Sequence, residues 1–399
     1  MSEFETTGLS ITLFKPTITV NTATTPYSAT WIPEGAYLGS YTAEVTSYQH
    51  TIQAVGGYES ATFTLVCSLS DLENWVQQGL GLHVRVADAA NIVVWEGFVD
   101  SLAVSVGSMA LSLGPLTEIG NQVTAIYALE DTSVRPPTSG VRTRTATQEH
   151  LISETKYGLF PKVLAIGAAT AAEAAYVRDL WCLENALPTT TKQIAMGMGA
   201  GEILLTFKCS GYYALLNYPY NQLPNTGTIN LSTKIGAILT AAPNALFSVA
   251  NSSINANALQ VPAYEGDDQE GWSIIKDLVT HGDASSLYRY TCGVYADRRV
   301  VYTVVDWIIT YHSRLFDPLQ QVMDVNGNVI QPWATLAGKW LFTPDFMAGM
   351  DLGTNGPWGD IRCMFLESVT YTSPYSIQLQ GGRADRVTQK LNQLGLGGI

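Results

Sequence analysis

The amino-acid sequence predicts a mainly β protein with short helices (α+β), organised as two antiparallel β-barrel or β-sandwich domains joined by a helical insertion. Segments in which apolar and polar residues alternate occur on both sides of one long helical pattern, and such alternation is typical of half-buried strands. The chain has 399 residues, of which 46% are hydrophobic and 14% are charged. It is therefore expected to be globular and long enough for more than one hydrophobic core.

The first 128 residues are expected to form an arm followed by a β domain. Residues 1–30 are rich in Thr and interrupted by prolines, so we expect an extended N-terminal arm. Residues 31–128 contain the alternating patterns of the first β domain. One short helix is expected among these strands, with a capping box formed by Ser70 and Glu73.

Residues 129–200 are expected to be a linker and helical insertion. Their first part is rich in Pro, Thr and Arg, which is typical of a connection. A capping box of Thr170 and Glu173 then begins the clearest helix of the chain. We expect this helix to pack a face containing Val177 and Trp181 against a β domain.

Residues 201–381 return to strand patterns and are expected to form a second β-rich region. A helix that places Trp272 and Ile275 on one face is expected before residue 282, and a type I′ hairpin is expected at Asn326-Gly327. Residues 382–399 are expected to be a C-terminal helix or tail.

One stretch, from Val279 to Ser286, contains the residue types of a hydrolase triad. His281 and Gly282 stand where the preceding helix is expected to end, and a histidine is favourable at a helix C-terminus. A GxSxG nucleophile motif does not occur in the sequence. We therefore interpret the stretch as a helix end and expect the protein not to be an enzyme.

No metal or organic cofactor is expected. The five cysteines include no CxxC pair, and the five histidines show no HxxxH or HExxH spacing. The sequence also contains no run of about 18 apolar residues and no signal-peptide pattern at its start. We therefore expect the protein to be made and folded in a cytoplasm.

The net charge of −13 is concentrated in the N-terminal third. Residues 1–128 contain eleven acidic and two basic residues, a balance of −9, and the remaining residues contribute −4. Because nucleic-acid binding depends on Lys and Arg at phosphates, this distribution argues against a domain that grips nucleic acid. It suits a surface that nucleic acid passes without adhering.

Two longer patterns resemble one known family. The stretch containing "LGLHVRV", "VVWEGFVDSL" and "LSLGPLTEIGNQVTAIY" is similar to the N-terminal domain of phage tail-tip, or baseplate, hub proteins, whose fold is related to the tail-tube subunit. The stretch "ISETKYGLFPKVLAIGAATAAEAAYVRDLWCLENALP" resembles the helical insertion in the middle of these proteins. The C-terminal "IRCMFLESVTYTSPYSIQLQGG" also fits, so the resemblance covers most of residues 35–385.

The resemblance implies a structural role in the virion of a tailed bacteriophage, after assembly in the host cytoplasm. It implies two tail-tube-like domains per subunit and a homotrimeric ring that closes the distal end of the tail tube. The implied partners are the tail tube or a distal tail protein, the tape-measure protein and the central tip or fibre proteins. Phage DNA would be in contact only in transit through a lumen.

Six acidic residues in loops or on polar strand faces are candidates for lining this lumen: Glu59, Asp71, Glu73, Asp88, Glu96 and Asp100. Three alternatives to the hub remain. One is a hexameric distal tail adaptor on the same tube-like fold, which the number of subunits would distinguish. Another is a carbohydrate-binding module of the adsorption apparatus, for which the tyrosine-rich run from Tyr212 to Tyr220 would be the site. The third is a hydrolase, kept only because the pattern of residues 129–168 predicts no definite structure.

Overall fold

The computed structural model describes residues 8–89, 91–107, 109–131, 138–194, 202–220, 227–263, 268–283, 290–304, 310–312, 322–324, 329–330, 341–342, 364–372 and 376–382. Strands dominate these residues, and five α-helices accompany them. The mainly β fold class is therefore confirmed. The expected Asn326-Gly327 hairpin and the C-terminal helix or tail lie outside the described residues. No helix among the described residues is long and apolar enough to cross a membrane.

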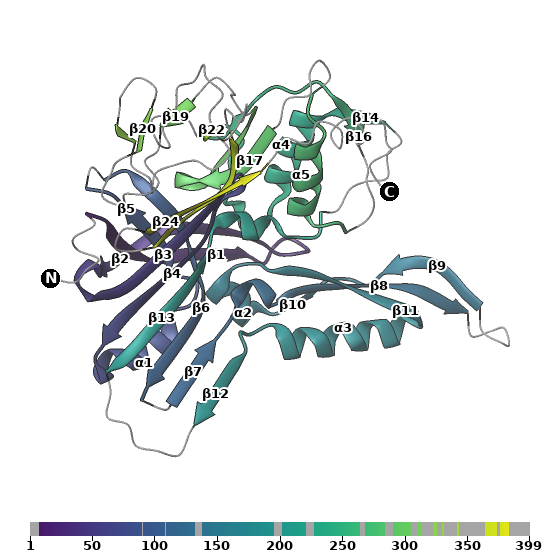
Figure 1. Cartoon of the computed structure of the whole chain (residues 1–399). Helices are drawn as coiled ribbons and strands as arrows, with labels where there is room; N and C mark the ends of the chain where they lie inside the picture. The colour runs from purple at the N-terminus through teal and green to yellow at the C-terminus, as the bar shows by residue number, and fades with distance from the viewer. Residues whose placement is uncertain are drawn as a thin grey trace.

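The main sheet is built around β6 (Val93–Val106), as Figure 1 shows. Along one edge, the first part of β6 pairs with β5 (His83–Ala87) and its last part pairs with β7 (Met109–Leu113). The other edge of β6 pairs with β13 (Ile203–Ser210). From β13 the sheet continues outward through antiparallel pairs to strands from both ends of the chain: β4 (Val55–Cys67), β3 (Val45–Gln53), β23 (Met364–Thr372) and β24 (Ser376–Gly382). The pairings among the described strands do not close into a barrel.

The expected N-terminal arm is instead part of the main sheet. Strand β1 (Ser10–Asn21) forms a hairpin with β2 (Ser28–Ser40) and also pairs with β5. Ile11 and Leu13 are fully buried, because their alternation matches the two-residue period of a strand. The proline that suggested an arm, Pro16, falls at a register shift of the β1–β2 pair, where a missing backbone N–H is tolerated.

The expected boundary near residue 201 does not separate two sheets. Strand β13 lies between β4 and β6, and β17 (Tyr290–Tyr295) pairs with β4 in parallel. Strand β17 also pairs with β18 (Arg299–Val304). The strand patterns themselves were correct, but neighbouring strands in a sheet need not be neighbours in sequence, so periodicity alone could not place this boundary.

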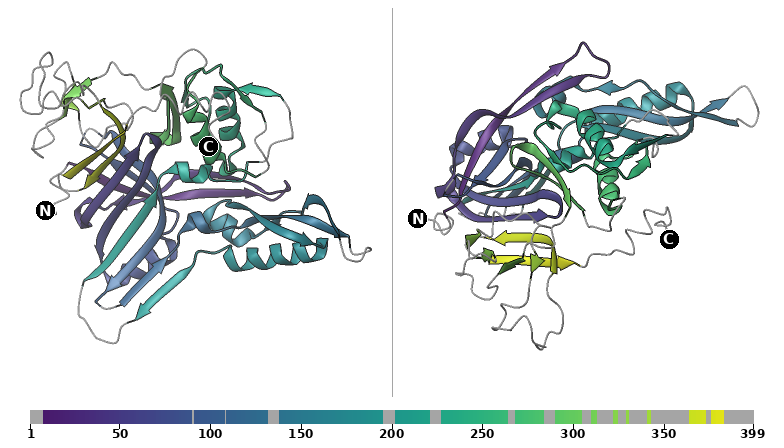
Figure 2. Two further views of the ribbon diagram at one scale, coloured as in Figure 1. Left: turned by 45° about the vertical axis from the view of Figure 1, so that its right-hand side comes forward. Right: turned by 90° about the horizontal axis from the view of Figure 1, so that it is seen from above.

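The insertion is a separate small sheet with helices. Strand β8 (Gln122–Asp131), which the sequence placed mostly in the first domain, pairs with β9 (Thr138–Arg144), β10 (Gln148–Glu149) and β11 (Pro161–Ala169). Two helices accompany these strands, α2 (Leu151–Tyr157) and α3 (Ala171–Asn185). Figures 1 and 2 show the insertion extending to one side of the main sheet, with α3 lying along β8 and β11.

Helix α3 confirms the predicted cap and corrects the predicted face. Thr170 and Glu173 form the reciprocal capping box. The buried positions are Ala174, Arg178 and Cys182, which recur every four residues on the side that faces the sheet. Val177 is exposed, so its predicted burial is wrong, and Trp181 is half-buried with its ring over Gly120.

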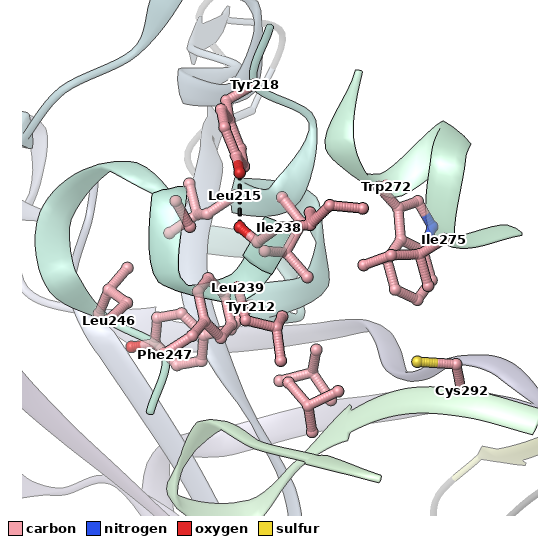
Figure 3. Close-up of a cluster of buried hydrophobic side chains, with 14 of the residues drawn as sticks. Tyr212, Leu215, Tyr218, Ile238, Leu239, Leu246, Phe247, Trp272, Ile275 and Cys292 are labelled. Carbon is pink, nitrogen blue, oxygen red and sulfur yellow. Dashed lines mark hydrogen bonds between the residues drawn. The ribbon is translucent and has the colours of Figure 1, made fainter. Parts of the chain in front are cut away.

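Two large buried clusters share the main sheet. One cluster lies among β1, β3, β4, β5, β6 and β13 and includes the stacked rings of Phe63 and Phe207, whose centroids are 4.7 Å apart. The other includes residues from α4 (Leu231–Ala241), α5 (Gly271–Thr280) and the 3-10 helix η4 (Tyr212–Leu216), and part of it is drawn in Figure 3. Strand β6 contributes Trp95 to the first cluster and Phe98 to the second, so both faces of its first half are covered.

Of the remaining helix predictions, one needs a small correction and one is confirmed. Helix α1 (Leu69–Gln78) is capped by the side chain of Ser68, not by Ser70. Helix α5 buries Trp272, Ile275 and Leu278 as its periodicity predicted.

Candidate functional site

The six candidate lumen acids lie at different ends of the main sheet. Asp71 and Glu73 are exposed on α1, which begins just after β4 ends. Glu59 lies near the start of the paired part of β4, where Ser60 is the partner of Ser210. Because a strand rises about 3.3 Å per residue and β4 runs on from Glu59 to Cys67, these two places are roughly 26 Å apart along the sheet. The acids therefore do not form one cluster within a subunit.

All six acids have partners within the subunit. Asp71 accepts a hydrogen bond from the Ser68 hydroxyl, and Glu73 accepts one of 3.0 Å from the Gln77 side-chain amide. Asp88 accepts a hydrogen bond from the Ile92 backbone N–H at 2.8 Å and so closes the β5–β6 turn. Asp100 is half-buried and accepts hydrogen bonds from the backbone N–H (2.9 Å) and the hydroxyl (3.2 Å) of Thr117. Burial raises the pKa of Asp100, and these hydrogen bonds limit the rise. Burial likewise raises the pKa of Glu59, whose carboxylate accepts a hydrogen bond from Gln53.

Glu96 is the candidate that the structure contradicts. Its side chain is only 2% exposed, so it cannot present a carboxylate to a water-filled passage. Both faces of β6 are covered at this point, and Glu96 contacts the short 3-10 helix η6 (Ala296–Arg298). That cover comes from a segment two hundred residues later, so the local pattern around Glu96 carried no sign of it.

Glu96 belongs to a buried charged cluster that sequence reasoning missed. The Arg298 guanidinium Nη1 lies 3.2 Å from Glu96 Oε1 and also contacts Glu34 on β2. The backbone N–H of Asp297 donates a 2.8 Å hydrogen bond to Glu96 Oε2. His83 Nε2 is 3.8 Å from Glu34 Oε1, and its Nδ1 is 2.8 Å from the Tyr212 hydroxyl.

The pKa values in this charged cluster are displaced by burial and by neighbouring charge. Burial raises the pKa of Glu96 to about 7, although the Arg298 guanidinium and the Asp297 N–H oppose this rise. Burial lowers the pKa of His83 to about 4, so its imidazole is neutral near pH 7. The pKa of Glu34 is lowered because the stabilising effect of Arg298 outweighs partial burial. One guanidinium therefore balances one carboxylate, and the second carboxylate retains its proton to an unusually high pH.

Three side chains of this charged cluster lie close enough together to hold a metal ion. Ligand atoms of Glu34, His83 and Glu96 all lie within 4.8 Å of one another. The Arg298 guanidinium, however, already contacts both carboxylates. A divalent cation would have to displace this fixed positive charge, so the arrangement is better suited to an internal ion network than to metal binding. No spacing motif joins these residues, which explains why each seemed isolated in sequence.

The stretch around His281 is a helix end, as predicted. Helix α5 ends at Thr280, His281 is the C-terminal capping residue, and Gly282 has a φ of 70°. His281 Nδ1 lies 2.9 Å from the Asp277 carbonyl oxygen of the last turn. Ser285 and Ser286 lie outside the described residues.

The tyrosine-rich run is largely interior. Tyr212 and Tyr218 are buried, and the Tyr218 hydroxyl donates a 2.5 Å hydrogen bond to the Ile238 carbonyl, drawn in Figure 3. Tyr213 is half-buried and packs on Trp272, with ring centroids 5.5 Å apart. The hypothesis that this run is a carbohydrate-stacking surface is therefore wrong for Tyr212 and Tyr218.

The exposed large hydrophobic side chains lie elsewhere. Large hydrophobic side chains are exposed on β2, on the insertion and at a few single positions: Ile32, Tyr37, Leu38, Ile92, Leu129, Leu151, Ile152, Tyr176, Val177, Leu180, Leu183, Leu187 and Val249. Most of them belong to α2, α3 and the segment that follows α3, so the insertion carries an apolar surface that the sequence pattern did not reveal.

No protein-family model matches the chain, and no curated protein matches it. Among solved structures, the chain is similar to the 43 kDa tail protein of prophage MuSo2 from Shewanella oneidensis. That similarity covers 94% of this chain and 97% of the other, with a TM-score of 0.38 and 8% sequence identity. Similarity at this level establishes neither the family nor the function of the chain.

Proposed function

We propose that the chain is a non-enzymatic structural subunit of a tailed-phage virion, the hub ring at the distal end of the tail tube. Three copies would form the ring and contact the tail tube or distal tail protein, the tape-measure protein and the central tip or fibre proteins. The observation that carries the proposal is the set of large hydrophobic side chains exposed on β2 and on the insertion.

Exposed large apolar side chains that gather on one element, as four do on α3, are typical of a surface that a partner covers. The exposed fractions in the single chain are 74% for Ile152, 68% for Tyr176 and 70% for Leu183. Their exposure would be unfavourable in a free monomer, because apolar surface gains about 25 cal/mol per Å² when it leaves water. A chain with only 14% charged residues has correspondingly little surface adapted to remain in solvent alone.

The proposed position of the chain in the virion, at the distal end of the tail tube, rests on the resemblance of its sequence to hub proteins. The charge distribution is compatible with that position, because −9 over residues 1–128 becomes −27 in a ring of three copies. Exposed acids such as Asp71 and Glu73 would repel DNA in transit and so prevent adhesion to the passage wall.

The number of subunits in the purified particle tests the proposal. Native mass spectrometry of the full chain should give a trimer, and electron microscopy should show a ring with three-fold symmetry. A hexamer would favour the distal tail adaptor in place of the hub. A stable monomer that does not assemble at any concentration, or that binds glycans in a defined stoichiometry, would contradict a ring-forming structural role.

A further inference from the structure

Helix α3 has apolar side chains on two opposite sides. The side with Ala174 and Cys182, which also holds the buried Arg178, packs on the small sheet of the insertion. Four large apolar residues, Tyr176, Leu180, Leu183 and Leu187, point the other way; we call them the outer stripe. A surface helix normally has one apolar face, so a helix with two is expected to be covered on both.

The outer stripe has the spacing of a helix–helix contact. Its members follow one another at intervals of four, three and four residues, with Leu187 just after the helix end. This alternation keeps side chains on one line along a helix and is the spacing of coiled-coil seams, in which each side chain fits between four residues of a facing helix. Figure 1 shows α3 with the small sheet along one side, and the exposures place the outer stripe on the side away from it.

The charges beside the outer stripe are acidic. Glu173, Asp179 and Glu184 are exposed on α3, and Arg178 is the only basic residue in the helix. Arg178 is turned inward, where it donates a hydrogen bond to the Ala146 carbonyl at 2.6 Å and pairs with Asp179. A second α3 placed against this face would set acidic flanks against acidic flanks, which is unfavourable.

We infer that the outer stripe is a docking site for an α-helix of another protein, one that carries an apolar seam with lysines or arginines beside it. The apolar residues would supply most of the buried area, and the acidic flanks would select a basic partner and set its register. This inference depends only on α3 and stands independently of a place in a phage tail.

Two synthetic peptides test the inference. Both are helices about three heptads long with Leu at positions a and d; one carries Lys at e and g, and the other carries Glu there. Fluorescence anisotropy with the full chain should show that the Lys peptide binds at least about tenfold more tightly at low salt. The difference should shrink as added salt screens the flanking charges.

Substitutions in the chain distinguish peptide binding at the outer stripe from nonspecific hydrophobic binding elsewhere on the surface. Leu180→Ser combined with Leu183→Ser should abolish binding of the Lys peptide. Leu183→Ser alone should weaken this binding severalfold. It should have little effect on folding, because Leu183 is largely exposed. Ile32→Ser, at an exposed apolar residue on β2, is the matched control and should leave the affinity unchanged. Glu184→Lys should reduce the preference for the Lys peptide.

Three results would overturn the inference. The two peptides could bind equally, which would remove the role of the acidic flanks. Ile32→Ser could weaken binding as much as Leu183→Ser, which would mean that the peptide attaches without using the outer stripe. Sedimentation could show that Leu180→Ser with Leu183→Ser dissociates the chain's own oligomer, in which case a second copy covers this face.

Discussion

At the scale of single residues, the contact between Glu96 and Arg298 ties distant parts of the chain together. Arg298 lies at the end of the turn between β17 and β18, and its guanidinium joins Glu34 on β2 to Glu96 on β6. Asp297 and Arg298 both have positive φ angles, of 58° and 56°, so the turn is held in a conformation that non-glycine residues rarely adopt. The charge contacts and the Asp297 N–H bond to Glu96 compensate for that conformation.

Removal of the guanidinium should destabilise the fold strongly. At about pH 8, above the Glu96 pKa of about 7, Arg298→Ala leaves the ionised Glu96 buried without its charge partner, and the loss of one member of a buried pair typically costs about 3–5 kcal/mol. Urea unfolding should show a lower free energy of unfolding for this variant, and adding Glu96→Gln should restore part of it. Arg299→Ala, at the exposed neighbouring residue, should change the free energy by less than about 0.5 kcal/mol. Equal effects of the two arginine substitutions would contradict the role of the charged cluster.

The raised pKa of Glu96 should appear as a pH dependence of stability. Between about pH 4.5 and 7 the folded chain holds a proton on Glu96 that the unfolded chain has released, so the free energy of unfolding should fall as pH rises through this window. The total fall should be about 2–3 kcal/mol. Glu96→Gln removes this contribution, whereas the opposing contribution of His83, whose pKa is about 4, is present in both chains and cancels. Parallel pH profiles for the two chains would show that the Glu96 pKa is not raised.

At the scale of elements, the loop between α2 and β11 is held by two buried asparagines. Asn121 donates a 2.7 Å hydrogen bond to the Gly158 carbonyl and accepts one of 2.8 Å from the Phe160 N–H. Asn244, just after α4, accepts from the Leu159 N–H at 2.7 Å and donates to the Leu159 carbonyl at 2.9 Å. The amide side chains replace the backbone partners that a strand would have provided. Asn244 also joins the insertion to the end of α4.

Asn244→Ala should loosen this junction. It removes both hydrogen bonds to Leu159, leaves buried backbone groups unsatisfied and places alanine at a φ of 70°. The expected loss is about 2–4 kcal/mol. Hydrogen exchange should quicken at the amides of residues 159 and 160, whereas Asn217→Ala, at an exposed asparagine, should leave these amides protected. Unchanged exchange in the Asn244 variant would mean that Asn121 alone holds the loop.

At the scale of the whole molecule, the arrangement of strands decides which charges can reach a passage for DNA. Burial removes Glu96 from the candidates, and Glu59, Asp88 and Asp100 are half-buried. Asp71 and Glu73 remain exposed on α1, at one end of the main sheet. If the proposed ring exists, this end is where charge reversal should affect DNA most directly.

Glu73→Lys should therefore slow genome ejection without preventing assembly. A ring of lysines would attract phosphate, and added salt should weaken the effect because it screens that attraction. Asp277→Lys, at an exposed residue of α5 outside the acidic third, is the control and should eject DNA at the original rate. Ejection from Glu73→Lys particles at the original rate in low salt would exclude α1 from the passage wall.

The sequence by itself determined several of the strands, the buried face of α5 and the cap of α3. The periodicity around Phe63 and Trp272 and the Thr170–Glu173 capping box depend on neighbours within a few residues, so local reasoning found them. Only the tertiary structure decided that β13 lies between β4 and β6, that Glu96 is buried beneath Arg298, and that α3 exposes a second apolar side. Each of these depends on a contact between residues far apart in sequence, and the burial of a side chain is set by what covers it in space, which a local periodicity cannot specify.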